Sequence, residues 1–247
     1  MTKIIQSLSQ IGADYDVLFC DLWGCLHNGV EAYPAAVAAL RDFRAGGGRV
    51  VLLTNAPRPW RYVVDQLDRM AVPRDAWDVV VSSGDAAQDA MFAGAVGRKV
   101  WAVMMAKDEG FFSDIPPEWQ DAEPIQRVAL DEAEGIVCTG LFDEVNETPE
   151  DYRAPLMLAR ERGLKLLCAN PDVVVDLGET RLYCAGALAE FYESLGGTSL
   201  YFGKPHPPIY DLARRRLGLG DDARILAVGD GRSAAPAGFP DSPSDPT

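Results

Sequence analysis

The stretch that decides the fold is YDVLFCDLWG, residues 15–24, in which an apolar run ends at an acidic residue, Asp21. Two further apolar runs follow along the chain, RVVLLT at 49–54 and WDVVVS at 77–82, and stretches with helical spacing separate the three runs. Continuous apolar runs of this length are typical of parallel strands covered on both faces. The alternation of strand and helix therefore predicts an α/β fold with right-handed crossovers and an open parallel sheet.

The same alternation continues less regularly through the rest of the chain. A second α/β unit is expected at 86–180, which leaves 1–85 and 181–231 as a Rossmann-like core, and the Pro- and Ser-rich stretch 232–247 is expected to be disordered. Helices are predicted at 34–45, 59–70, 149–163, 186–195 and 208–217, and strands at 15–20, 49–54, 77–82, 99–105, 135–139, 164–169, 173–176, 199–202 and 224–228.

The composition narrows the class of protein. With 23 Lys and Arg against 37 Asp and Glu, the formal net charge is 23 − 37 = −14, which argues against binding to nucleic acid. No apolar run is long enough to cross a bilayer, and the first residues lack the apolar core of a signal peptide. The five cysteines form no C-x-x-C pair and are interpreted as free thiols. A cytoplasmic protein with no membrane partner is therefore expected.

Polar residues with complementary chemistry follow four of the predicted strands. Asp21, Thr54 with Asn55, Lys204 and Asp230 each come directly after an apolar run. Ligands of open parallel sheets bind at the carboxyl ends of the strands. This set suits phosphoryl transfer, since it offers a carboxylate nucleophile, donors for a phosphoryl oxygen, a cation and an acidic Mg²⁺ ligand. Taken singly, each residue could instead be a helix cap, a turn former or a solvated loop charge.

Five segments together resemble the motifs of one family. They are D-L-W-G-C-L-H-N-G at 21–29, L-L-T-N at 52–55, C-A-N-P-D at 168–172, G-K-P-H-P-P-I-Y at 203–210 and A-V-G-D at 227–230. The set resembles motifs I to IV and the cap segment of the haloacid dehalogenase-like hydrolases, in particular the class IIA branch. That branch includes phosphatases of nucleotides, sugar phosphates, pyridoxal phosphate and nitrophenyl phosphate. The resemblance implies that the unit at 86–180 is an inserted α/β cap domain.

The resemblance also implies a mechanism. Asp21 would attack phosphorus in line and form an aspartyl-phosphate that water hydrolyses. Mg²⁺ would be held by the carboxylates of Asp21 and Asp230 and by the backbone carbonyl of Trp23. Lys204 would neutralise charge between the nucleophile and the phosphate, in keeping with a reaction that needs mostly positioning and charge stabilisation.

The remaining implied residues bind the substrate, a small phosphorylated metabolite. Thr54 and the backbone N–H groups near Asn55 would hold the phosphoryl oxygens. Asn170 and Asp172 of the cap segment would face the substrate, although a turn that caps a helix is an equally good interpretation of this segment. Members of the branch often pair through their caps, so the resemblance also implies a homodimer.

Two departures from the family pattern bear on activity. Trp23 stands where the phosphatases carry a second Asp that protonates the leaving group, a function worth roughly 100- to 10,000-fold. Ala235 stands where motif IV carries a second Asp, so the chain is expected to be truncated or shifted in reading frame there, with a natural tail as the alternative. A non-catalytic protein that binds a phosphorylated ligand or a partner is therefore the second hypothesis, and a dehalogenase the third.

Overall fold

The computed structural model describes residues 4–177 and 180–230, which form two compact units. Of the described residues, the first unit comprises 4–54, 64–81 and 204–230, and the second comprises 55–63, 82–177 and 180–203. Each unit contains its own parallel sheet with helices around it, so the predicted α/β class is confirmed. No helix in the described part of the chain is long and apolar enough to cross a membrane.

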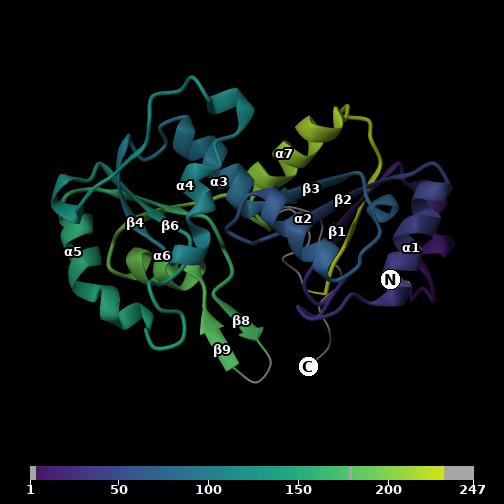
Figure 1. The fold of residues 1–247 in the computed structure, drawn as a ribbon, viewed down its shortest axis with the longest axis horizontal. Coiled ribbons are helices and arrows are strands. Elements are labelled where there is room, and N and C mark those ends of the chain that lie inside the picture. The colour runs from purple at the N-terminus through teal and green to yellow at the C-terminus, as the bar shows by residue number, and fades with distance from the viewer. Residues whose placement is uncertain (1–3, 178–179, 231–247) are drawn as a thin grey trace. The chain divides into compact units, whose positions relative to one another are not determined.

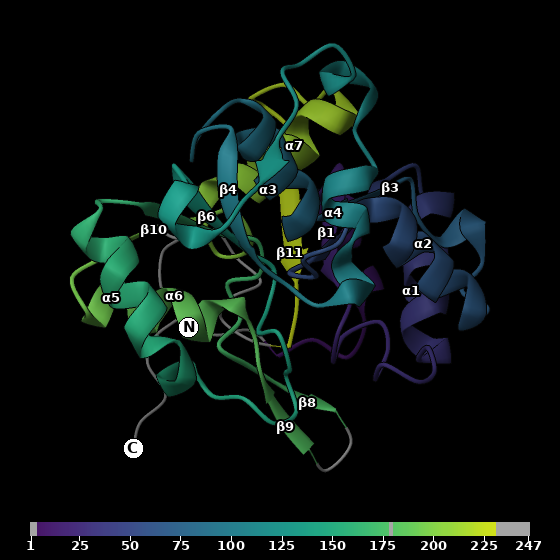
Figure 2. The ribbon, with the colours of Figure 1, turned by 60° about the vertical axis from the view of Figure 1, so that its left-hand side comes forward.

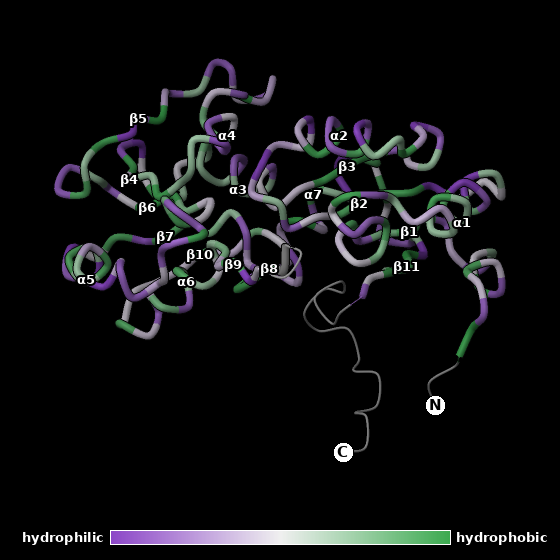
Figure 3. The backbone as a smooth tube through the Cα atoms, turned by 60° about the horizontal axis from the view of Figure 1, so that its bottom comes forward, coloured by the Kyte–Doolittle hydropathy of each residue, from purple (hydrophilic) through white to green (hydrophobic). Residues whose placement is uncertain are grey.

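The sheet of the first unit is built from the apolar runs that the sequence indicated. Its strand order is β11-β1-β2-β3, and the strands are β1 (Val17–Asp21), β2 (Arg49–Thr54), β3 (Val79–Ser82) and β11 (Ile225–Val228) (Figure 1). β1 is buried along its whole length between β2 and β11, and both neighbours run parallel to it. Hydrophobic residues dominate these strands, as the green tube in Figure 3 shows.

Three helices accompany this sheet: α1 (Pro34–Ala45), α2 (Trp60–Arg69) and α7 (Pro207–Leu217). α1 and α7 begin with proline, which suits the first turn of a helix because its missing N–H needs no partner there. α7 ends at Gly218, whose φ of 61° is the left-handed conformation that closes many helices. The ring of Tyr210 on α7 stacks with Phe19 of β1 at 6.2 Å between centroids, which packs α7 against the strand that carries Asp21.

The second unit has a five-stranded parallel sheet. Its order is β10-β7-β6-β4-β5, and the strands are β4 (Lys99–Val103), β5 (Gln126–Arg127), β6 (Gly135–Cys138), β7 (Lys165–Cys168) and β10 (Thr198–Tyr201). An antiparallel hairpin of β8 (Val174–Leu177) and β9 (Thr180–Tyr183) extends from this unit, as Figures 1 and 2 both show. The helices are α3 (Ser83–Phe92), α4 (Gly110–Ser113), α5 (Arg153–Glu161) and α6 (Ala185–Ser194).

Helix α3 was not predicted from its sequence, SGDAAQDAMF, because Gly, Ala and polar residues leave no clear apolar stripe. Local hydrogen bonds define its start instead. The Ser82 hydroxyl accepts from the Asp85 N–H, and the Asp85 carboxylate accepts from the Ser82 N–H, which forms a capping box. The other carboxylate oxygen of Asp85 accepts from the N–H of Trp60 at the start of α2. One acidic side chain thus fixes the beginnings of two helices.

The second compact unit is longer than the insertion predicted at 86–180. It contains all of 82–203, because β10 pairs with β7 and α6 packs against both strands. The pattern of alternating elements gave no sign of this pairing. That the residues outside the core of 1–85 and 181–231 act as a cap over the site stays a prediction. The predicted disorder of 232–247 falls outside the described residues.

Candidate active site

Asp21 is the last residue of β1, and its carboxylate is buried beside a lysine. The side chains of Asp21 and Lys204 are only 11% and 4% exposed, and Lys204 Nζ lies 2.5 Å from Asp21 Oδ1. The backbone N–H of Leu22 donates to the same oxygen at 2.7 Å. Burying a charge is costly unless it is paired, and here each charge compensates the other. Lys204 and the Leu22 N–H therefore hold the Asp21 carboxylate in a fixed position at the end of β1.

Strand register brings two more of the predicted residues to this edge. Asp21 lies opposite Leu53 in β2, so Thr54 is the next residue at the end of that strand. On the other side, Cys20 lies opposite Val228 in β11, and Asp230 follows two residues later. The strand order β11-β1-β2 therefore places Asp230, Asp21 and Thr54 along one edge of the sheet, as the parallel pattern predicted.

The loop after β1 is held tightly by its own backbone. The Leu22 carbonyl accepts from the N–H groups of Cys25, Leu26 and His27, at 3.3, 2.8 and 3.0 Å. Gly24 has a φ of 75°, and its N–H donates to the His27 carbonyl at 2.9 Å. A Cβ on Gly24 would collide with the carboxylate of Asp230. Only glycine therefore lets the Asp230 carboxylate approach this loop so closely.

Trp23 packs against its own loop. Its indole ring lies edge-on to the His27 imidazole at 5.8 Å between centroids, and a Cβ on Gly29 would collide with it. His27 Nδ1 accepts the Gly29 N–H at 3.0 Å, so the neutral imidazole carries its proton on Nε2. Burial lowers the pKa of His27, and the nearby Asp21 carboxylate only partly opposes this effect. Neither Trp23 nor a neutral His27 is an acid comparable to the carboxyl group that the family pattern places at residue 23.

Two thiols lie next to Asp21, and their contact was not expected from the sequence. Cys20 Sγ and Cys25 Sγ are 3.9 Å apart, within hydrogen-bonding distance. This contact raises the pKa of the buried Cys20 and lowers the pKa of the half-buried Cys25. In the described residues all five cysteines are free, as predicted. The spacing of five residues between the two cysteines does not indicate this contact, because only the turn at 22–27 brings Cys25 back to β1.

The second unit brings together the other predicted residues, Asn55, Asn170 and Asp172. Asn55 Nδ2 donates to Asp172 Oδ1 at 2.8 Å, and Asn170 Oδ1 accepts the Asp172 N–H at 3.0 Å. Gly186, at the start of α6, packs so closely against this segment that a Cβ would meet the Pro171 and Asp172 carbonyl oxygens. The N-P-D segment is thus a turn docked on a helix start and fixed by Asn55.

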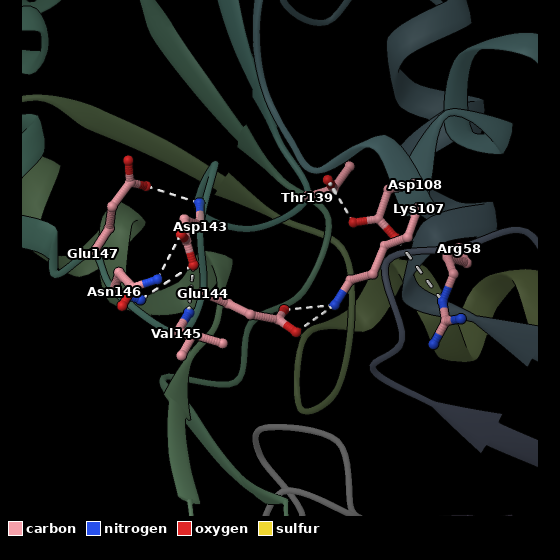
Figure 4. A network of polar contacts seen from close by, with 9 residues as sticks. All are labelled: Arg58, Lys107, Asp108, Thr139, Asp143, Glu144, Val145, Asn146 and Glu147. Atoms are coloured by element: carbon pink, nitrogen blue, oxygen red, sulfur yellow. Dashed lines mark hydrogen bonds and ion pairs between the residues drawn. The ribbon is translucent and has the colours of Figure 1, made fainter.

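A further polar network lies at the carboxyl ends of β4 and β6, where no functional residue was predicted (Figure 4). Asp108 is 2% exposed, accepts from the Thr139 hydroxyl at 3.1 Å and lies 4.0 Å from Arg58 Nε. Burial raises the pKa of Asp108. Lys107 Nζ contacts both carboxylate oxygens of Glu144 at 2.6 Å. Asp108 and Glu144 each face a basic side chain, Arg58 and Lys107 respectively, which is typical of a structural cluster.

The residues of the first unit suit a hard divalent cation. Among residues 4–177 and 180–230, no group of three His, Cys, Asp or Glu side chains lies close enough to hold a metal ion. The candidate set is of another kind, two carboxylates and a backbone carbonyl, and such all-oxygen sets are typical of Mg²⁺, which keeps several waters. The space that the missing Cβ of Gly24 leaves for Asp230 is the local feature that accommodates this set.

Comparisons with known proteins agree with this architecture. The sequence profile of a family described as haloacid dehalogenase-like hydrolase matches residues 18–115. A comparison with curated protein sequences found no match. Among solved structures, 4-nitrophenylphosphatase from Thermotoga maritima aligns with a TM-score of 0.66 at 18% identity, over 87% of this chain and 78% of that one. The class IIA fold implied by the motifs is thus confirmed.

Two further structures extend the comparison. Glycerol phosphate phosphatase from Mycobacterium tuberculosis, crystallised with magnesium, aligns with a TM-score of 0.67 at 22% identity, over 90% of this chain and 64% of that one. A haloacid dehalogenase-like hydrolase from Brucella suis 1330 aligns with a TM-score of 0.83 and covers 93% of this chain. Because that relative is 41% identical and 83% of its length is covered, the chain belongs to the haloacid dehalogenase-like hydrolase family.

Proposed function

We propose that this chain is a magnesium-dependent hydrolase of a small phosphorylated metabolite, and that Asp21 is its nucleophile. The observation that carries the proposal is the buried contact between Asp21 and Lys204 at the carboxyl end of β1. A carboxylate that is ionised, fixed and directed from a strand end can attack phosphorus in line and take the phosphoryl group as an aspartyl-phosphate. Water then hydrolyses this intermediate and releases phosphate.

The other residues at this edge position the phosphoryl group. Lys204 neutralises charge between the nucleophile and the incoming phosphate, which lowers the repulsion between two anions. The Thr54 hydroxyl and the backbone N–H groups near Asn55 hold the phosphoryl oxygens. In the second unit, Asn170 and Asp172 contribute to binding of the rest of the substrate, as the cap assignment implies. The hydrogen bonds of Asp172 with Asn170 and with Asn55 keep that segment in one conformation.

Asp21, Asp230 and the Trp23 carbonyl would hold the Mg²⁺ ion. When bound, the ion would supply positive charge against the phosphate oxygens in addition to that of Lys204. The magnesium in the Mycobacterium tuberculosis structure supports this assignment by family analogy.

The role of Gly24 in this site gives a testable expectation. Gly24→Ala should destabilise the fold by about 1–2 kcal/mol, because alanine is strained at positive φ. Its Cβ should also displace Asp230 and weaken Mg²⁺ binding, on the order of 10- to 100-fold. The matched control is Gly47→Ala, since Gly47 has a φ of 94° but no atom within 4 Å of its Cβ position. Titration calorimetry with Mg²⁺ should find an equal affinity for wild type and the control. An equal loss of Mg²⁺ affinity in both variants would contradict the assignment of Asp230 as a ligand of the ion.

Trp23 favours a second candidate function, binding without turnover. The indole cannot protonate a leaving group, and protonation of His27 is disfavoured by burial and by its bond from Gly29. A protein of this kind would hold a phosphorylated ligand at Asp21 and Lys204 without releasing product.

One experiment separates the two functions. Phosphate release and thermal stabilisation are measured on the same phosphate esters, 4-nitrophenyl phosphate and glycerol phosphate, each with and without Mg²⁺. Hydrolysis is expected for the nitrophenyl ester in the presence of Mg²⁺. Stabilisation by both esters without release of phosphate would establish binding alone, and the absence of both effects would contradict both functions.

A further inference from the structure

Cys20 and Cys25 lie on either side of the candidate nucleophile Asp21 in the sequence, and their side chains are in contact. Their sulfur atoms are 3.9 Å apart, although Cys20 lies inside β1 and Cys25 lies on the loop that follows it. Cys20 is 2% exposed, whereas Cys25 is half-buried. The pair therefore combines one thiol that reagents can reach with a second thiol already in contact with it.

The two sulfurs can be joined by a movement of one short loop. A disulfide has a sulfur–sulfur distance of about 2.05 Å, so the gap must close by about 1.9 Å. Cys20 is held in register with Leu52 and Val228 on both sides, which fixes its backbone in the middle of the sheet. Cys25 lies next to the exposed Gly24, on a turn that reaches the surface. The movement therefore falls on the segment from Leu22 to Cys25.

The remaining thiols of the chain are placed differently. Cys138 donates to the Gly140 carbonyl at 3.6 Å, and Cys168 donates to the Asn170 carbonyl at 3.2 Å. Cys184 is buried, and all three belong to the second unit. They serve as an internal reference for thiols that are protected by burial.

We propose that Cys20 and Cys25 are an oxidation site, at which a hydroperoxide converts the two thiols into a reversible disulfide that inactivates the Asp21 site. The accessible Cys25 thiol first reduces hydrogen peroxide, giving a sulfenic acid and one water. The Cys20 thiol then attacks the Cys25 sulfur, the sulfur–sulfur bond forms, and the hydroxyl group leaves with the Cys20 proton as a second water. Two thiols lose two electrons, and one peroxide gains them.

The effect on the site follows from the chain connection. The moving segment holds the Leu22 N–H, which donates to Asp21 Oδ1, and the Trp23 carbonyl. Displacements of about 1 Å in a catalytic geometry can cost 100-fold in rate. This consequence rests on the proposed function, whereas the formation of the disulfide does not.

The test counts thiols after treatment of the full chain with hydrogen peroxide. Alkylation under denaturing conditions should find the five thiols of the untreated chain and 5 − 2 = 3 after oxidation. The mass should fall by about 2 Da, and a cross-linked peptide should join Cys20 to Cys25. Hydrolysis of 4-nitrophenyl phosphate should fall by about tenfold or more and return with dithiothreitol.

Three variants make the result specific. Cys25→Ser should keep its 5 − 1 = 4 thiols and its activity in peroxide. In Cys20→Ala no disulfide can form at this site, so the Cys25 sulfur should become oxidised by added oxygen and the mass should rise and not fall. Cys184→Ser, the matched control, should still form the disulfide and go from four thiols to 4 − 2 = 2.

The outcomes separate the two parts of the account. Five thiols left after peroxide, or a disulfide that involves another cysteine, would overturn the oxidation site. A Cys20–Cys25 disulfide with undiminished hydrolysis would overturn inactivation. A chain that hydrolyses no ester before oxidation contradicts the proposed function, and its thiol count still decides whether the oxidation site exists.

Discussion

Asp21→Asn is expected to lower kcat for 4-nitrophenyl phosphate by about 10⁴-fold or more, the scale seen when an enzyme loses its nucleophile. The amide is nearly the same size as the carboxylate, but it carries no charge and cannot form an acyl phosphate. Phosphate release from activated esters is the measurement. Turnover that survives the substitution would exclude Asp21 as the nucleophile.

Loss of folding could imitate this result, because the substitution leaves Lys204 buried without its charged partner. Removal of one member of a buried ion pair costs about 3–5 kcal/mol. The double variant Asp21→Asn/Lys204→Met removes both charges and should regain much of that stability in urea denaturation. Because the double variant should remain inactive, a loss of rate that persists after stability returns belongs to the chemistry.

Trp23→Asp is expected to raise kcat/KM for an alkyl phosphate such as glycerol phosphate by about 10²- to 10⁴-fold. An alkoxide needs a proton to leave, and wild type has no carboxyl group at this position to supply it. The 4-nitrophenolate ion leaves readily without a proton, so its rate should change far less. The measurement is the ratio of kcat/KM for the two esters in wild type and variant, with Mg²⁺ saturating.

The matched control for this substitution is Trp23→Asn, which removes the indole and its packing on His27 and Gly29 but supplies no acid. If the Asn variant gains as much as the Asp variant, the ring obstructs the site and proton transfer is not what wild type lacks. If wild type already hydrolyses both esters equally well, another group donates the proton, and His27→Gln becomes the next variant to measure.

The sequence predicts the sheet of the first unit well because its signals are local. Apolar runs ending at Asp21, Thr54 and Val228 are strands of one parallel sheet, and α1 spans Pro34–Ala45 as its proline start and glycine stop indicated. Asp21, Thr54 and Asp230 follow strands of this one parallel sheet, so their common edge could be expected from the order of the strands. Lys204 instead follows β10 in the sheet of the second unit, so strand order alone does not account for its contact with Asp21.

Other features depend on contacts between distant segments and leave no local pattern. The extent of the second unit depends on the pairing of β10 with β7, and the helical stretch predicted at 149–163 divides into a 3-10 turn (Pro149–Tyr152) and α5. The contact between Cys20 and Cys25 requires a turn built on one glycine with positive φ.

The mass of the protein during turnover tests the central claim most directly. Wild type mixed with 4-nitrophenyl phosphate and Mg²⁺, then quenched in acid, should carry one added phosphoryl group on the peptide that contains Asp21. The Asp21→Asn variant should carry none under the same conditions. A phosphoryl group on another residue, or hydrolysis by wild type with no phosphorylated protein at any quench time, would contradict an aspartyl-phosphate mechanism at Asp21.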